Sequence, residues 1–404
     1  MTSAGETRND AVITGAGVVA PLAVGLSSFW EQLLARRDVL ACSPESRFGA
    51  PVPEKSFSLS ASGFDIEDHA DYGLVRRWPR FSSISLVAAQ EAMKRSEFPE
   101  DAQRENSGVV LGTAFSASEY HFEYFEGLFF EGLREASPLL FSESVMNGAS
   151  GHISHQLNLR GPGLTLIGSE DVGLHALSAA LDQLRLGEVC CVIAGGSDEY
   201  CDVHQTSLAS YGVLSGEASR PFSAGSPPAP VGEGACFFVM ETESGARDRG
   251  ARILARVLGS GYGRRLPQDP AGEAVTLAVR TALVDAGVDV ESIGLVVSGA
   301  AGGELDRLEL DGLTTLFDVR RPLMFAVPKQ LLGEAFGFSS AAQALVGAMA
   351  LATETVPGFG AREDSLLPEA WRVPEESERL EGDSVLVLSA TREGGATAVI
   401  LGSA

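Results

Sequence analysis

The sequence predicts an α/β fold in which a largely buried sheet is covered by helices. Apolar, strand-like runs bounded by glycine recur along the whole chain, and a segment with helical spacing of its apolar residues accompanies most of them. The 404 residues are 45% hydrophobic, so the chain is long and apolar enough to bury a large core, as one domain or as two halves.

In the first half, apolar runs and helical patterns alternate. The run at 11–21 precedes SSFWEQLL, a helical pattern that a serine can cap, with Phe29, Trp30, Leu33 and Leu34 on one face. The remaining expected elements of this half are a helix at about 82–95, a strand at 108–113, a strand at 161–168, the helix that follows it, and a strand at 189–196.

The second half repeats this scheme, which suggests an internal duplication with halves at 10–248 and 249–404. Its expected elements are a helix at 273–286, strands at 293–299 and 323–328, a helix rich in glycine and alanine that ends near 352, and a final pair of strands.

The charge of the chain excludes several classes of function. With 54 acidic and 30 basic residues the formal charge is −24, which disfavours nucleic acid and anionic membrane surfaces. The chain has no run of 18 apolar residues, and its first ten residues lack the order of a signal peptide, so we expect a cytoplasmic protein. The five cysteines form no CxxC pair, so we expect no disulfide framework, no metal site and no cofactor.

Four segments together resemble the β-ketoacyl synthases of the thiolase fold. They are VITGAGVVAPLAVGLSSFWEQLLA, GPGLTLIGSEDVGLHAL, SRPF followed by VGEGACFFVME, and LVVSGAAGGELDRLE with FAVPKQLLGEAFG. Each segment alone is weak, but all four occur in the family's order and cover nearly the whole chain. The resemblance implies duplicated βαβαβαββ halves stacked as five αβαβα layers.

The resemblance also implies that the catalytic triad is lost. The family uses a cysteine nucleophile at a helix start and two histidines that stabilise developing negative charge. Aligned on the family motifs, the nucleophile position is Glu170, and the two histidine positions are Ser298 and Glu334. All six histidines lie at or before position 204, so the second half contains none. Near the C-terminus, ATREGGAT around Glu393 replaces a loop that has a phenylalanine between glycines in active synthases.

A synthase-like chain without the triad resembles the chain length factor, or ketosynthase-β, of type II polyketide synthases. Such a subunit pairs with an active ketosynthase-α as a heterodimer, or a dimer of heterodimers, that condenses malonyl units on acyl carrier protein by decarboxylative Claisen chemistry. The resemblance makes Leu164, Thr165, Leu166 and Ile167 part of the strand that pairs across the interface. Because acyl carrier proteins are acidic, we expect the partner to dock them.

The same resemblance places the partner's tunnel wall at about 118–130. Candidates for tunnel or gate residues are Ser118, His121, Phe122, Phe125, Phe129 and His204. A dead subunit can limit product length, since a growing chain stops where bulky side chains block it. The alternative is that the rings, which share one helical face, pack in the core of this chain, and that the histidines make ordinary polar contacts.

Two other functions remain open. The chain could be an atypical acyltransferase or decarboxylase that uses Glu170, Ser169 or Cys201, or a scaffold that pairs with a synthase without touching substrate. Glu170 itself could simply belong to a helix-capping sequence, since carboxylates and serine are favoured in first turns.

Overall fold

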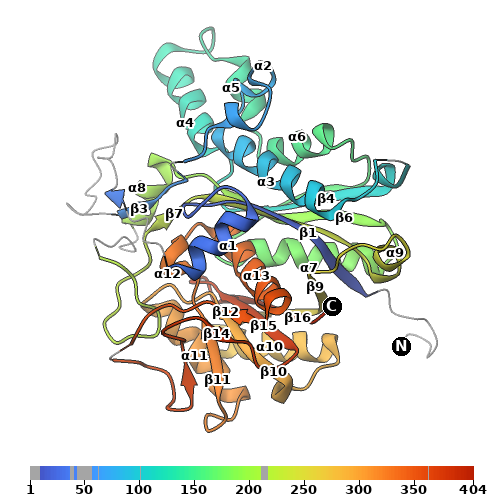
Figure 1. Cartoon of the computed structure of the whole chain (residues 1–404). Coiled ribbons are helices and arrows are strands. Elements are labelled where there is room, and N and C mark those ends of the chain that lie inside the picture. Colours follow the sequence, from blue (N-terminus) through green and yellow to red (C-terminus); the bar gives the residue numbers. More distant parts are fainter. Residues whose placement is uncertain are drawn as a thin grey trace.

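The structure is a computed structural model, and one mixed sheet runs through it. The residues that it describes are 10–36, 41–42, 57–61, 63–100, 102–210, 217–362 and 364–404. Within them the sheet has eleven strands, in the order β13-β11-β10-β15-β16-β9-β1-β8-β6-β4-β5. The two halves of the chain meet where β1 pairs with β9, and helices cover and separate them (Figure 1).

The two halves have the same strand order. Across the sheet, the first half contains β5 (Gly163–Ile167), β4 (Ser107–Thr113), β6 (Cys191–Asp198), β8 (Gly234–Thr242) and β1 (Ala11–Val19). The second contains β11 (Leu323–Ala326), β10 (Ile293–Ser298), β15 (Ser384–Ala390), β16 (Gly395–Gly402) and β9 (Ala255–Arg264). Counted along the chain, both orders are 3-2-4-5-1, with the first three strands parallel and the rest antiparallel. This shared topology confirms the predicted duplication.

The helices complete the five layers that the sequence predicted. Two central helices, α7 (Val172–Arg185) and α13 (Phe336–Thr353), contact strands of both halves. The outer layers are α3 (Arg80–Ser96) with α6 (Gly148–Gln156) on the first half, and α10 (Glu273–Ala286) with α11 (Glu304–Leu316) on the second. α13 is long and apolar enough to cross a membrane by composition, but it lies mostly buried at the centre of the fold. A helix that is apolar all round is expected in such a central layer.

The remaining elements connect these layers or extend from them. The helical ones are α1 (Leu26–Leu34), η1 (Ile66–Asp68), α2 (Tyr72–Val75), η2 (Ala102–Asn106), α4 (Ser118–Glu126), the π-helical η3 (Gly127–Glu131), α5 (Pro138–Glu143), α8 (Asp202–Ser210), α9 (Glu243–Asp248), η4 (Val290–Ser292) and α12 (Lys329–Leu332). The short strands are β2 (Ala41–Cys42), β3 (Phe57–Leu59), β7 (Val231–Gly232), β12 (Thr355–Val356), β13 (Trp371–Arg372) and β14 (Glu378–Arg379). The boundary between halves at 248 stays a prediction.

Glycines allow the starts of the two central helices to meet. A Cβ added to Gly173 on α7 would lie 2.2 Å from the carbonyl oxygen of Gly337 on α13, and one on Gly196 of β6 would lie 2.0 Å from the same atom. Neither position can therefore hold a larger residue without moving the backbone. This contact brings together the chain segments just before α7 and α13.

Two sequence expectations for local structure need comment. The prediction that a serine caps α1 is wrong. The helix begins at Leu26, and its N-cap residue is Gly25, which has no side chain to accept a hydrogen bond. The Glu91 carboxylate of α3 accepts the Leu26 N–H at 2.8 Å instead. Among the described residues, Cys190, Cys191, Cys201 and Cys236 form no disulfide. Residues 1–9, which include most of the segment tested for a signal peptide, and the Cys42 side chain lie outside the described part.

Candidate functional site

The three positions that the resemblance assigned to the lost triad lie together in the structure. Glu170 is in the turn between β5 and α7, Ser298 ends β10, and Glu334 lies between α12 and α13. All three are buried. Lys329, fully buried on α12, forms an ion pair with Glu334. Its charge also acts on Glu170 and on Glu309, the partner of Ser298, where it opposes the rise in pKa that burial causes.

Glu170 is held by a charge from the other half of the chain. Its carboxylate forms a close ion pair with Arg392 and accepts a hydrogen bond from Ser169 Oγ at 2.6 Å. Burial is the main cause that raises the pKa of Glu170, and the nearby Glu334 raises it further, while Arg392, Ser169 and Lys329 oppose this. The capping interpretation is wrong, because α7 begins at Val172 with Asp171 as its N-cap and the Glu170 carboxylate binds side chains instead.

Ser298 takes part in a second buried group. Its hydroxyl donates a short hydrogen bond to Glu309, and it accepts the Ala300 N–H at 3.0 Å. The other oxygen of Glu309 accepts the N–H of Gly299 at 3.1 Å and of Ala390 at 3.2 Å. Burial raises the pKa of Glu309 to about 7, against the effect of these hydrogen bonds. Ser298 therefore stabilises a carboxyl group in the core.

Glu334 has a structural role at the start of α13. It accepts a hydrogen bond from Lys329 Nζ at 2.7 Å, from the Phe336 N–H at 3.0 Å and from Ser339 Oγ at 2.8 Å. A carboxylate at a helix start is favoured by the free N–H groups and the helix dipole. With the lysine, the backbone and the serine all bound, Glu334 has no hydrogen to donate to a substrate carbonyl.

A cavity of about 670 Å³ opens beside Glu170. One wall is apolar and includes Phe115, Leu208 and Phe336, and the other includes the Glu170–Arg392 pair with Ser169 and Glu393. Ser169 Oγ also lies 2.9 Å from Glu393, so its single proton lies between two carboxylates. Glu393, an exposed residue of the cavity lining, adds further negative charge there.

Neither alternative nucleophile is prepared for attack. Burial raises the pKa of Cys201 to about 12, which keeps it a thiol rather than the reactive thiolate. The Ser169 hydroxyl hydrogen-bonds to the carboxylates of Glu170 and Glu393. Within the described chain no histidine hydrogen-bonds to it, so no histidine is placed to act as its general base. The geometry favours a stable charge network over group transfer.

His204, one of the gate candidates, lies behind the apolar wall of this cavity. It is fully buried on α8 and stacks on Phe115 with ring centroids 4.1 Å apart, and on Phe336 at 5.3 Å. Its Nδ1 lies 3.4 Å from the Glu199 carbonyl, and burial lowers its pKa to about 4, so the ring is neutral. Within the described chain its Nε2 has no hydrogen-bond partner.

The other gate candidates lie on a lobe that projects from the first half, at the top of Figure 1. Ser118, His121, Phe122 and Phe125 are on α4, and Phe129 is on η3. Neither element has a buried residue, and Phe125 and Phe129 are 46% and 76% exposed. The interpretation of these rings as core packing is therefore wrong for this chain.

Within the lobe, the aromatic side chains form one exposed stack. The His121 and Phe125 rings are stacked with centroids 6.5 Å apart, and Phe125 and Phe129 follow at 6.0 Å. Partial burial lowers the pKa of His121, so the stack is uncharged at neutral pH. We call the exposed apolar residues Phe125, Phe129, Phe130, Leu133 and Phe141 the aromatic lobe.

The predicted interface strand β5 is the last strand of the sheet. Its free edge has no partner among the described strands, and Leu164 and Ile167 are 38% and 50% exposed. Thr165 Oγ1 lies 2.9 Å from Ser150 Oγ of α6, whereas Leu166 packs against the main core. An open, apolar edge strand is a ready template for pairing with another chain.

The sequence reasoning missed Arg392. It identified the loop around Glu393 as a departure from the family but gave its arginine no role. A signal was present, because an acidic residue at a buried position needs a compensating cation and Arg392 lies in the loop that faces this site.

Comparisons with known proteins agree with this fold. The family model "Beta-ketoacyl synthase, N-terminal domain" matches residues 8–246, and "Beta-ketoacyl synthase, C-terminal domain" matches 253–360. Similar curated proteins include 3-oxoacyl-[acyl-carrier-protein] synthase 2 of Coxiella burnetii, 27% identical over 86% of both chains. Nodulation protein E of Rhizobium sp. (strain N33) is also 27% identical, over 86% of this chain and 87% of its own.

Two solved structures have the same fold. The ishigamide ketosynthase/chain length factor superposes with a TM-score of 0.88 at 24% identity, over 98% of this chain and 100% of the other. A chain from the structure of a type II polyketide synthase acyl-carrier protein in complex with its ketosynthase superposes with a TM-score of 0.84 at 20% identity, over 98% of this chain and 100% of the other. The family models span both halves, and the folds match over nearly the whole chain, so this protein belongs to the β-ketoacyl synthase family.

Proposed function

We propose that this chain is a non-catalytic partner subunit of an active ketosynthase, of the chain-length-factor type. One observation carries the proposal: the positions that align with the family's triad hold Glu170, Ser298 and Glu334, and each is bound by other side chains of the same chain. No cysteine or histidine is available there to form an acyl thioester or to stabilise an oxyanion.

Two surfaces support a role through assembly. β5 has an open edge with exposed apolar residues, and the aromatic lobe exposes several large rings in the same half of the chain. Exposed apolar patches of this kind mark interaction sites in soluble proteins. In the proposal β5 pairs with the corresponding strand of a ketosynthase-α, and the aromatic lobe lines or borders the partner's tunnel and limits product length.

The names of the structural neighbours are consistent with the proposal. One is a ketosynthase/chain length factor, and another contains a ketosynthase with its acyl-carrier protein. In the proposal the carrier delivers malonyl units mainly to the partner, within a cytoplasmic type II polyketide pathway, since the chain's own charge of −24 disfavours an acidic carrier.

The alternative is an enzyme with an atypical active site. It is favoured by the similarity to curated 3-oxoacyl-[acyl-carrier-protein] synthases, and Glu170 and Ser169 would be its reactive groups. A carboxylate that replaces the cysteine cannot form a thioester, and loss of an oxyanion donor typically costs a factor of 10² to 10³ in rate.

Two measurements separate these functions. The purified chain alone is incubated with acyl carrier protein that carries a labelled malonyl group. We expect it to release no carbon dioxide and to take up no label. Co-expressed with a synthase that has the cysteine and both histidines, it is expected to co-purify as a heterodimer that makes product only when both chains are present. Labelling or decarboxylation by the chain alone, abolished in Ser169→Ala or Glu170→Gln, would establish the alternative.

A further inference from the structure

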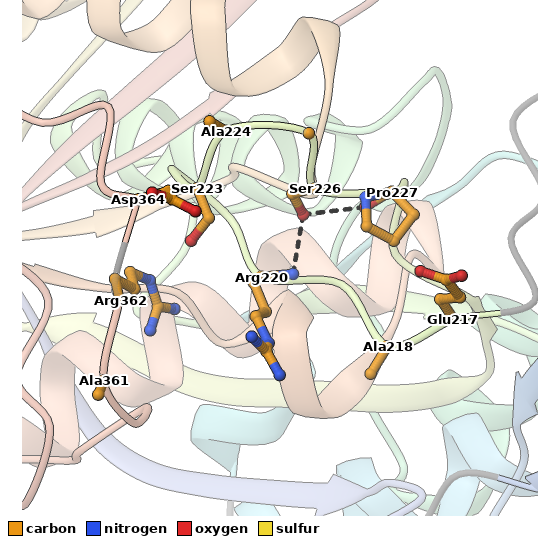
Figure 2. Close-up of a pocket in the computed structure, with 11 residues that line it drawn as sticks. Glu217, Ala218, Arg220, Ser223, Ala224, Ser226, Pro227, Ala361, Arg362 and Asp364 are labelled. Carbon is orange, nitrogen blue, oxygen red and sulfur yellow. Dashed lines mark hydrogen bonds between the residues drawn. The ribbon is translucent and has the colours of Figure 1, made fainter.

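Two pockets, separate from the cavity beside Glu170, share Arg220 as a lining residue. The first, of about 410 Å³, lies between the loop at 217–227 and residues 361, 362 and 364 (Figure 2). The second, of about 420 Å³, is lined by Arg36, Arg220, Gln330 and Phe359 among others. Arg220 and Ala218 line both, so the two pockets share a wall.

Within the described chain, the hydrogen-bond partners of Arg362, on the first pocket, are all uncharged groups. Its Nε donates to the Pro221 carbonyl at 3.0 Å, Nη1 to those of Phe359 at 3.2 Å and Gly360 at 2.8 Å, and Nη2 to Gln330 Oε1 at 2.5 Å. These contacts use four of the five N–H groups of a guanidinium. The charge has no carboxylate within hydrogen-bond distance in the described chain, so it remains available to an anion.

Arg220 is close to Arg362 and has the same charge. Its backbone N–H donates to Ser226 Oγ at 2.8 Å, which fixes the loop, and the described chain shows no hydrogen bond from its guanidinium. Figure 2 shows the side chains of Arg220 and Arg362 turned toward the same side of the pocket. Burial, and then the charge of Arg220, lower the pKa of Arg362 to about 10, while Asp306 opposes this. Two nearby guanidinium groups of this kind repel each other until an anion lies between them.

Arg36, at the end of α1, brings a third guanidinium to the same place. Its Nη1 donates to the Glu375 carbonyl at 2.7 Å, and a Cβ added to Gly360 would lie 3.9 Å from this nitrogen. Because Arg362 binds the carbonyl of that same Gly360, the two arginines converge on one residue.

Two carboxylates are among the residues that line the first pocket. Asp364 lies beside Ser223 on the same side of the view as Arg362, and Glu217 lies near Pro227 at the other side (Figure 2). Among the described residues, those that line the second pocket include no carboxylate. The side of Arg220 that faces Arg36 is therefore a cationic surface on a chain with a net charge of −24.

We propose that Arg36, Arg220 and Arg362 form a binding site for a phosphate group, either inorganic phosphate or the phosphate of a small organic monoester. Guanidinium groups donate charge-assisted N–H···O bonds to phosphate. The guanidinium of Arg220 is the main donor in the proposal, and Arg36 and Arg362 add positive charge and their remaining N–H groups to match a dianion. The pocket beside Arg220 has room for the organic part of a monoester. This site is independent of the proposed pairing with a ketosynthase.

The test uses the full chain and its Arg220→Gln variant. At constant ionic strength, isothermal titration with inorganic phosphate and with glycerol phosphate is expected to show saturable binding to the wild type. Binding is expected to be at least tenfold weaker in Arg220→Gln. The matched control is Arg320→Gln, since Arg320 is exposed and pairs with Asp318 on α11's side of the chain, and this variant should bind like the wild type.

Each outcome decides the proposal. Equal affinity for both probes supports an inorganic phosphate site, and tighter binding of the monoester supports an organic ligand. Absence of saturable binding, or equal binding by Arg220→Gln, overturns the proposal. Thermal unfolding without phosphate separates binding from folding, because Arg220→Gln removes an exposed side chain and should unfold at the wild-type temperature or slightly above.

Discussion

Strands β5 and β11 have the same place in the two halves of the chain, but their surroundings differ. Each is the third strand of its half and pairs with the second in parallel. β5 leaves its outer edge open and is partly exposed along its length, whereas all of β11 is buried and β13 pairs with it. Trp371 of β13 is 3% exposed and packs on Phe317 and Phe325.

The outer strand of the first half therefore has an open edge, whereas the corresponding strand of the second half is covered by β13. The duplication supplied the same unit twice, and a two-residue strand with one tryptophan closes the edge of the second copy. The first copy leaves its edge open and adds the aromatic lobe nearby. Under the proposed function the first half carries the surface that meets the ketosynthase.

The largest expected effect is on assembly through the open edge. Ile167→Asp would bury an unpaired charge between paired strands, and we expect heterodimer affinity to fall at least about 100-fold. Pull-down of the co-expressed synthase and analytical ultracentrifugation measure this. Val284→Asp is the control from the second half, because Val284 is also an exposed apolar residue, 78% exposed on α10 against 50% for Ile167, and should leave pairing intact. Normal pairing by Ile167→Asp would place the interface elsewhere.

A substitution in β13, which covers the edge of the second half, should instead lower the stability of the folded chain. Trp371→Ala removes a buried ring from the second half, and we expect the free energy of unfolding to fall by about 3–5 kcal/mol. Phe130→Ala is the matched aromatic control in the first half, where an 85% exposed ring should contribute less than about 0.5 kcal/mol. Denaturant unfolding of the two isolated variants tests the contrast, which equal losses would remove.

The two halves are also joined by the Glu170–Arg392 pair. Arg392→Gln leaves a buried carboxylate without its cation, and we expect a loss of about 2–4 kcal/mol at neutral pH. Burial already raises the pKa of Glu170, so protonation at lower pH should reduce the loss. Adding Glu170→Gln should recover most of the stability. If the double variant is as unstable as Arg392→Gln, the arginine stabilises the loop by other contacts.

The first half also contains a buried acid that should make stability depend on pH. Burial raises the pKa of Glu199 to about 8, so the folded state binds a proton that the unfolded state releases near its ordinary value. This contribution is present at low pH and is lost as the pH rises toward 8. Glu199→Gln should therefore flatten the fall in melting temperature between pH 5 and pH 8. An unchanged slope would show that Glu199 is ionised in the folded protein.

The smallest expected effect on the fold, and a specific one on function, is in the aromatic lobe. Phe125→Ala removes a half-exposed ring, so we expect less than about 1 kcal/mol of lost stability. Under the proposed function the assembled complex should make longer products, because Phe125→Ala removes a bulky side chain that is proposed to limit the partner's tunnel. Mass spectrometry of the products measures this, and an unchanged product spectrum at unchanged turnover would exclude Phe125 as a gate.

Much of the fold follows from local sequence patterns. The helices predicted at 82–95 and 273–286 are present as Arg80–Ser96 and Glu273–Ala286, and the strand expected at 108–113 is Ser107–Thr113. These elements are predictable because apolar periodicity reports which side of an element is buried. The group that caps α1 was not predictable in this way, because the first N–H of the helix is bound by Glu91 of α3 and not by a neighbouring serine.

The sequence by itself determined the family resemblance, the two halves and the absence of histidine from the second. Only the tertiary structure decided how the chain tolerates an acid at the nucleophile position, because Arg392 reaches Glu170 from the other half, whereas Lys329 and Glu334 are only five residues apart. It also decided that the rings of the aromatic lobe face solvent, which helical spacing cannot distinguish from packing in a core. Spacing in a sequence identifies a face of a helix, but the layers of the fold determine what that face meets.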